Sequence, residues 1–265
     1  MTHFACTMCG KCCQDLRLPL SVAESVSWIR RGGTLEVFCD AVPWPVEPAA
    51  DDVPAQHKRR VSFAAASGSQ PIRVIVTLVA AFDGPCPNLR DDMRCDIYDE
   101  RPRVCRIYPA EVVPYLKFVP ANKLCPPEAW SATHPPFEQN GRIFDAETAE
   151  IIRQSRETTA QDADVKQRVM ALLGFTAAAF SNEGFVIYTP DPAAALDALE
   201  TAIAAASSPM SIEAIHDWTF VSNQQETVEA LRSIKAKATA SDPHDPQEGP
   251  AFQYLGFRPA QSASH

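Results

Sequence analysis

Eight of the nine cysteines in this chain of 265 residues fall into two groups, and this clustering restricts the possible folds more than any other feature. The first group has two-residue gaps and ends in an adjacent pair: Cys6, Cys9, Cys12 and Cys13. The second group is more widely spaced: Cys86, Cys95, Cys105 and Cys125. Thiolate is the softest ligand that a protein offers, and it selects zinc, copper(I) or iron–sulfur centres. The pattern therefore predicts a metal-binding protein in which these eight cysteines are the ligands.

The number and spacing of the cysteines favour different metals. A structural zinc site and a cubane iron–sulfur cluster (4Fe-4S) each use four thiolates, so eight cysteines allow two complete sites, or one site and four spare thiols. Two closed zinc sites would leave no thiolate over. The repeated two-residue gap is typical of cubane-binding loops, and Cys86 and Cys125 each precede proline, as the remote cysteine of the ferredoxin run does. We expect an iron–sulfur cluster ahead of zinc and keep zinc as the alternative.

The adjacent pair restricts how the ligands are shared. Side chains of neighbouring residues diverge from an extended backbone, so Cys12 and Cys13 are not expected to bind one ion. Cys13 would turn towards another centre or towards the second group. Gly10 suits a loop that bends around a metal, because such a bend often needs a positive φ. Both groups are therefore expected to contribute ligands together.

Simpler roles are expected of several other residues in the N-terminal part of the chain. Five basic residues lie beside cysteines in the sequence, where they either offset the charge of the centre or form a solvated face: Lys11, Arg94, Arg101, Arg103 and Arg106. Tyr98 and Tyr108 are expected to shield the centre from water. The lone Cys39 is expected to be a small buried apolar residue, and His3 is not expected to be a ligand.

Composition and charge limit the location and the partners. Hydrophobic residues make up 46% of the chain, enough for a core, and the formal charge of −9 with no basic block excludes a nucleic-acid partner. The first residues form no apolar signal core, and the longest apolar stretch, 74–82, is too short to span a bilayer. We therefore expect a cytoplasmic protein without a membrane partner. A protein partner or protein substrate is compatible with the sequence, and the oligomeric state stays open.

The composition changes after the last cysteine and predicts three parts. Residues 1–134 are expected to form a cysteine-cluster metal-binding module, 135–238 a helical region and 239–265 a disordered tail. The predicted fold class is α+β, in which an irregular metal-nucleated module with short strands and helices precedes a helical C-terminal part.

Local signals predict the elements of each part. Ser21 and Glu24 form a capping-box pattern that predicts a helix through Arg31, and a short helix after Pro102 is expected to carry Cys105. Residues 41–56 are expected to be a loop. Strands are predicted at 61–66, 72–82 and 112–119, the first two as a hairpin. Four helices of the C-terminal part are predicted to begin at capping residues: Asp145, Asp162, Asp191 and Ser222.

Two runs of sequence carry a resemblance to a known family. The first is Cys6-x-x-Cys9-Gly-x-Cys12-Cys13, and Cys86-Pro-Asn-Leu leads to the second, Cys95-Asp-Ile-Tyr-Asp-Glu-Arg-Pro-Arg-Val-Cys105-Arg-Ile-Tyr-Pro. Residues 4–128 resemble the CxxCxxCC cysteine-cluster family (YkgJ-like proteins), whose members are described as zinc- or iron-chelating. The resemblance implies metal binding through these cysteines. The family includes a flagellin lysine N-methylase, so it also implies an enzymatic option.

Three functions therefore remain open at the level of sequence. The first is an iron–sulfur protein with a redox or metal-dependent modification activity, and the second is a zinc-stabilised protein-interaction module without catalysis. The third is an enzyme similar to a protein lysine N-methylase. Whether the chain is an enzyme is left open, because glycine-rich nucleotide loops, H-E-x-x-H and G-x-S-x-G are absent and no catalytic residue is indicated.

Overall fold

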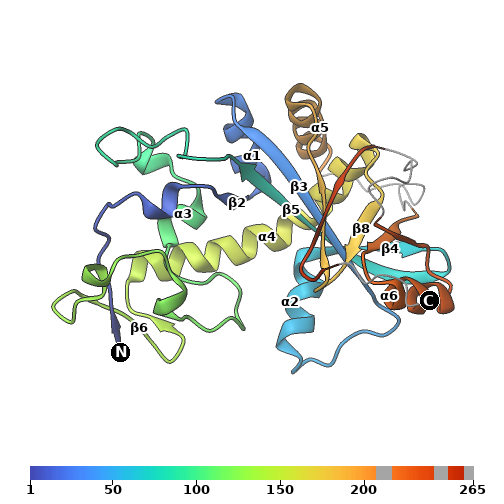
Figure 1. The fold of residues 1–265 in the computed structure, drawn as a ribbon, viewed down its shortest axis with the longest axis horizontal. Coiled ribbons are helices and arrows are strands. Elements are labelled where there is room, and N and C mark those ends of the chain that lie inside the picture. Colours follow the sequence, from blue (N-terminus) through green and yellow to red (C-terminus); the bar gives the residue numbers. More distant parts are fainter. Residues whose placement is uncertain (207–216, 242–249, 260–265) are drawn as a thin grey trace.

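The computed structural model describes residues 1–206, 217–241 and 250–259, and a mixed β-sheet lies at its centre (Figure 1). The nine strands of this sheet are β2 (Arg17–Leu20), β3 (Thr34–Pro43), β4 (Ser62–Ser67), β5 (Gln70–Ala81), β8 (Ala177–Phe180), β9 (Gly184–Tyr188), β10 (Thr219–Ser222), β11 (Ala238–Ala240) and β12 (Gln253–Gly256). Their order is β11-β10-β8-β3-β5-β2, with β4 paired to β5, and with β9 paired to both β3 and β12.

The sheet joins the N-terminal and C-terminal parts of the chain. Strand β3 pairs antiparallel with β5 along its whole length, from Thr34↔Ala81 to Pro43↔Ile72. On its other side β3 pairs parallel with β8 and antiparallel with β9. Strands β8, β10 and β11 are parallel to one another. The sheet therefore continues across residue 135, where the sequence predicts a boundary.

Helices surround the sheet and connect it to the cysteine-rich residues. They are α1 (Val22–Arg30), α2 (Val53–Val61), α3 (Arg103–Ile107), α4 (Ala146–Leu173), α5 (Pro192–Ala204) and α6 (Gln225–Ser233). Helix α4 has 28 residues and runs from the cysteine-rich side of the molecule to the sheet, where it contacts α1, α2 and α5 (Figure 1). Its other end contacts α3, so α4 fixes the cysteine-rich side relative to the sheet.

The cysteine-rich side has little regular structure. It holds a small sheet of β1 (Thr2–His3), β6 (Pro136–Gln139) and β7 (Arg142–Ile143), and four short 3-10 helices: η1 (Lys11–Cys13), η2 (Tyr98–Glu100), η3 (Pro120–Asn122) and η4 (Pro127–Trp130). Its hydrophobic cluster is small: Ile107, Ala110, Phe137, Ile151 and Ile152. The main core lies around the central sheet, where Val37, Val74 and Leu78 are completely buried.

The predicted fold class, α+β, is confirmed, and so are most of the local signals. The capping box of Ser21 and Glu24 begins α1, and β4 and β5 form the expected hairpin. Asp145 caps α4, which ends at Gly174 in the left-handed region, and Asp191 caps α5. These signals succeed because each depends on residues only a few positions apart.

Four predicted elements differ from the structure. Residues 112–119 form no strand, and the expected loop at 41–56 contains the start of α2, which Asp52 caps through Ala55 N. Asp162 begins no helix, since α4 continues through it and its carboxylate instead accepts a hydrogen bond from Val22 N at the start of α1. The last helix begins after Gln224 rather than at Ser222.

The C-terminal part is helical but also contributes strands. Helices α4, α5 and α6 lie there as predicted, and strands β8 to β12 were not foreseen. The tail expected to be disordered, 239–265, contains β12, which pairs with β9 from Gln253↔Ile187 to Gly256↔Gly184. Its residues 242–249 and 260–265 lie outside the described residues. Over the described ranges, the helices are too short or too polar to cross a membrane.

Candidate metal centre

The first cysteine group lies on a tight loop that ends in a short helix. Gly10 has a φ of 69° and Met8 a φ of 51°, so the backbone turns twice through the left-handed region. Cys13 N donates to Gly10 O at 2.9 Å, which closes the turn of η1. The positive φ expected at Gly10 is confirmed. Such a turn directs successive backbone N–H groups towards one space, where they stabilise negative charge.

Backbone pairing joins the end of this loop to the start of the second group. Cys86 N donates to Cys13 O at 2.8 Å, and Gln14 and Pro85 form an antiparallel bridge. Asp15 N donates to Gly84 O at 2.8 Å, which continues the pairing. Cys13 and Cys86 therefore lie side by side although 72 residues separate them in the sequence.

The segment between Cys86 and Cys95 folds back on itself. Leu89 N donates to Cys86 O at 2.8 Å, and Leu89 and Cys95 form an antiparallel bridge. The Met93 side chain fills the space beside Gly10, where no Cβ would fit. This contact packs the segment that carries Cys95 against the first loop.

The other end of the first loop lies near Cys125. Ala5 N donates to Ala129 O at 3.0 Å, and β1 pairs with β6. The Tyr108 hydroxyl, which follows α3, accepts a hydrogen bond from Leu124 N at 2.8 Å. The segment that precedes Cys6 is thus held against the segment that follows Cys125.

The pKa shifts of the thiols show which cysteines lie close enough to interact: Cys105 with Cys86 and Cys95, and Cys125 with Cys12. The hydrogen bond between the adjacent thiols lowers the pKa of Cys12 to about 7 and raises the pKa of Cys13. Burial raises the pKa of Cys105 to about 12, with further contributions from Cys86 and Cys95. Burial also raises the pKa of Cys125 to about 11, with a further contribution from Cys12. Gathered thiolates repel one another, and a bound cation removes that repulsion.

The sulfur atoms of the adjacent cysteines lie close together, but no larger group of ligand atoms converges within the described residues. Cys12 Sγ and Cys13 Sγ lie 3.9 Å apart, because η1 brings the two side chains together; the divergence expected of an extended backbone is therefore wrong. Among the residues described, no three His, Cys, Asp or Glu side chains converge closely enough to hold a metal ion. The donor set itself fits, since all eight candidates are free thiols and soft metals prefer thiolate. The backbone links bring both groups to one region.

The basic side chains near the cysteines differ in what they contact: some interact with thiols and others with carboxylates. Arg101 favours the thiolate forms of Cys12 and Cys105, as expected of a residue that offsets their charge. Arg103 and Arg106 instead form ion pairs with acidic residues of α1 and α4.

The structure also shows the surroundings of Cys39, of the two tyrosines near the cysteines and of His3. Cys39 is completely buried in β3, which confirms that it is a core residue. Tyr108 touches Cys125. Tyr98 is 54% exposed and stacks under Arg101, so its expected role as a shield is not supported. A ring nitrogen of His3 lies 2.6 Å from His134 O, which accounts for that side chain.

The cysteine region matches a known family. Residues 5–126 match the CxxCxxCC family, described as a "Putative zinc- or iron-chelating domain". The match covers the eight candidate ligands and ends before α4. This part of the chain is therefore similar to the CxxCxxCC domain, as its cysteine pattern indicates. No curated protein and no solved structure matches the chain.

Proposed function

We propose that the eight cysteines bind two metal centres, each with four thiolates and each with ligands from both groups. One centre uses Cys6, Cys9, Cys12 and Cys125. The other uses Cys13, Cys86, Cys95 and Cys105. The observation that carries this division is the pair of backbone links at the two ends of the first loop, since Cys13 pairs with Cys86 while Ala5 pairs with Ala129.

The spacing within each set supports iron–sulfur clusters as the metal. The first set combines three cysteines at two-residue gaps with a remote cysteine that precedes proline, as in a ferredoxin cluster loop. Arg101 lies where it offsets the negative charge of such centres. An iron–sulfur cluster supplies one-electron chemistry when bound, so the protein would serve in electron transfer or in a metal-dependent modification.

The weak core of the cysteine-rich side is a second reason to expect bound metal. Its hydrophobic cluster has five buried members, and Met8, Leu116 and Leu124 are exposed. A segment that buries so little apolar surface usually needs another source of folding free energy. Metal bound to thiolates supplies it, because the site does not exist in the unfolded chain.

Zinc is the second candidate, favoured by the number of thiolates. Two closed four-thiolate zinc sites would use all eight cysteines, and zinc needs no redox partner. In that case the domain is a structural module that holds the cysteine-rich side against α4, and its function is to present a protein-binding surface.

Metal and sulfide analysis of the full chain, purified without air, tests both the division and the metal. Cys9→Ser and Cys95→Ser should each remove about half of the metal, because each disrupts one of the two centres. Cys39→Ala is the matched control, since it removes a thiol from the core and should leave the metal content unchanged.

The alternatives give different results. Complete loss of metal in either single variant would mean one shared centre and would overturn the division. Stoichiometric zinc without acid-labile sulfide would reject the iron–sulfur clusters and leave the zinc module. Full metal content in Cys95→Ser would show that Cys95 is not a ligand and would overturn the second centre.

A further inference from the structure

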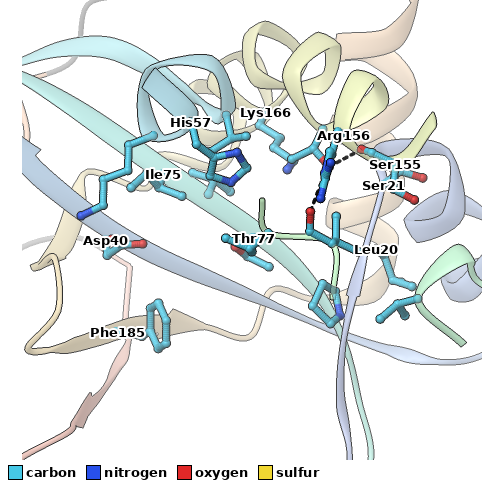
Figure 2. Close-up of a pocket in the computed structure, with 18 of the residues that line it drawn as sticks. Leu20, Ser21, Asp40, His57, Ile75, Thr77, Ser155, Arg156, Lys166 and Phe185 are labelled. Atoms are coloured by element: carbon cyan, nitrogen blue, oxygen red, sulfur yellow. Dashed lines mark hydrogen bonds between the residues drawn. The ribbon is translucent and has the colours of Figure 1, made fainter. Parts of the chain in front are cut away.

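A cavity lies between the central sheet and the helices, away from the cysteine loops. Its volume is about 460 Å³, within the range of small-molecule sites. Strands β2, β3 and β5 form its floor, and α2, α3 and α4 form its walls (Figure 2). The two halves of the chain therefore build it together.

Lys166 of α4 is the most unusual group in this cavity. Its side chain is 4% exposed and points into the space (Figure 2). In the part of the chain described here, its ammonium makes no hydrogen bond and no ion pair, and only the longer-range attraction of Asp162 favours its charge. Burial disfavours an ammonium that no carboxylate contacts, so an anion that entered the cavity would stabilise the charged form of Lys166.

Two further basic side chains, Arg156 and His57, face the same space. Arg156 donates its Nε–H to Val112 O at 2.6 Å, and its other nitrogens make no hydrogen bond within the described residues. His57 of α2 lies edge-on to the ring of Tyr115, 5.7 Å between centroids. Burial lowers the pKa values of Lys166, Arg156 and His57, which shows that the cavity disfavours their charged forms as long as no anion is present.

The acidic residues of the cavity are already engaged. Glu24 accepts hydrogen bonds from Ser21 N and Arg103 N, both at 2.8 Å, as part of the α1 capping box. Asp40 is held by Ser181 and attracted by Lys58, whose Nζ donates to Ser181 Oγ at 3.0 Å. Neither carboxylate is free to balance Lys166 and Arg156.

We propose that this cavity binds a small molecule with a carboxylate or phosphate group on an apolar body, and that Lys166 and Arg156 hold the anionic group. The apolar body would lie along Leu20, Ile75 and Phe185, which line the cavity on the sheet side. A site that is mostly apolar with a few convergent charged groups is typical of ligand pockets. The ligand would supply the counter-charge that the protein lacks there.

The cavity shares α3 with the proposed metal centre. Arg103 and Val104 line it, and Cys105 is the next residue of the same helix. A bound molecule would therefore lie one helix away from the cysteines. The proposal itself does not depend on metal, because every residue that it uses lies outside the cysteine groups.

Calorimetric titration of the full chain tests the proposal with four probes of similar size. Hexanoate and phenyl phosphate carry the two anionic groups, while hexylamine and hexanol are the cationic and neutral controls. Only the two anions should bind, and the tighter of them identifies the group. Lys166→Met should weaken anion binding about ten- to a hundred-fold, because it removes a charged hydrogen-bond donor. Arg153→Met is the matched control on the exposed face of α4 and should leave binding unchanged.

The thermal stability of each variant shows whether weaker binding comes from loss of the site or from loss of the fold. Lys166→Met removes an unsatisfied buried charge, so its thermal midpoint without ligand should equal or exceed that of the unmodified chain. Thr77→Phe fills the cavity from β5 and should also abolish binding while all the charges remain. The proposal is overturned if the neutral and anionic probes bind equally, or if Lys166→Met or Thr77→Phe binds the anions normally. It is also overturned if neither anion binds at about 10 mM.

Discussion

Removal of everything after Thr133 should unfold the cysteine-rich part rather than release it as a module. The predicted boundary near residue 135 falls between the last cysteine and α4. In the structure, however, β3 has partners on both sides, and the side formed by β8 and β9 lies beyond the cut. The fragment would expose that edge of β3 and remove α4 from the sheet.

The magnitude follows from the main core. Sixteen of its thirty-two buried residues lie after residue 133, so the sixteen that remain lose half of their surroundings. Burial of a large apolar side chain contributes about 1.5–3 kcal/mol. Renewed exposure of only six such side chains therefore costs about 9–18 kcal/mol. The net stability of a domain is about 5–15 kcal/mol, so the fragment should not fold alone.

Urea titration followed by circular dichroism measures this directly. The full chain should unfold cooperatively, whereas fragment 1–133 should show a broad transition or none, and a low metal content after anaerobic reconstitution. Addition of fragment 134–265 should restore both the transition and the metal, because it returns β8, β9 and α4. A cooperative transition with full metal content in fragment 1–133 alone would refute the reasoning and show that the cysteine-rich part is an independent domain.

Two further predictions concern single residues. Gly10→Ala and Gly32→Ala each place a Cβ at a positive φ, 69° and 82°, and each should lower the free energy of unfolding by about 1–2 kcal/mol in urea titrations. Only Gly10→Ala should also lower the metal content, because its Cβ would displace Met93, and equal metal contents would contradict the proposed packing of the two groups. Burial raises the pKa of Asp40 to about 6 from 3.8, so its contribution to stability is fully present below pH 3.8 and is lost as the pH rises to about 6. Asp40→Asn should therefore be more stable than the unmodified chain by up to about 3 kcal/mol at pH 7.5, with the difference disappearing near pH 4, and a constant difference across this range would contradict the assignment.

Features that depend on neighbours along the chain could be predicted from the sequence. The capping residues Ser21, Asp145 and Asp191 mark the starts of α1, α4 and α5, and Gly174 ends α4. The hairpin of β4 and β5 follows from two β-rich runs around a short turn. The cysteine spacing predicted a zinc- or iron-chelating domain, and residues 5–126 match that family. Each of these signals acts over a few residues, or is a chemical property of the side chains themselves.

Asp162 shows where local signals fail. It has the chemistry of a helix cap, but α4 already passes through it, and its carboxylate caps α1 instead, at Val22 N. An acidic side chain satisfies whichever backbone N–H groups the fold brings near it, so propensity alone cannot say which helix it caps. The strands β8 to β12 were missed for a related reason, because short strands are stabilised by their neighbours in the sheet rather than by their own sequence.

The sequence by itself determined the chemistry of the candidate ligands, the fold class and the starts of α1, α4 and α5, while only the tertiary structure decided which distant residues meet. The pairing of Cys13 with Cys86 and of Ala5 with Ala129 depends on contacts between remote segments, and our proposed division of the eight thiols rests on it. The position of Lys166 is a second case. The sequence shows only a lysine within a helix, and the lysine becomes buried because α4 packs across the sheet. Both results follow from one physical fact: local hydrogen bonds select the elements, but burial against remote partners selects their arrangement.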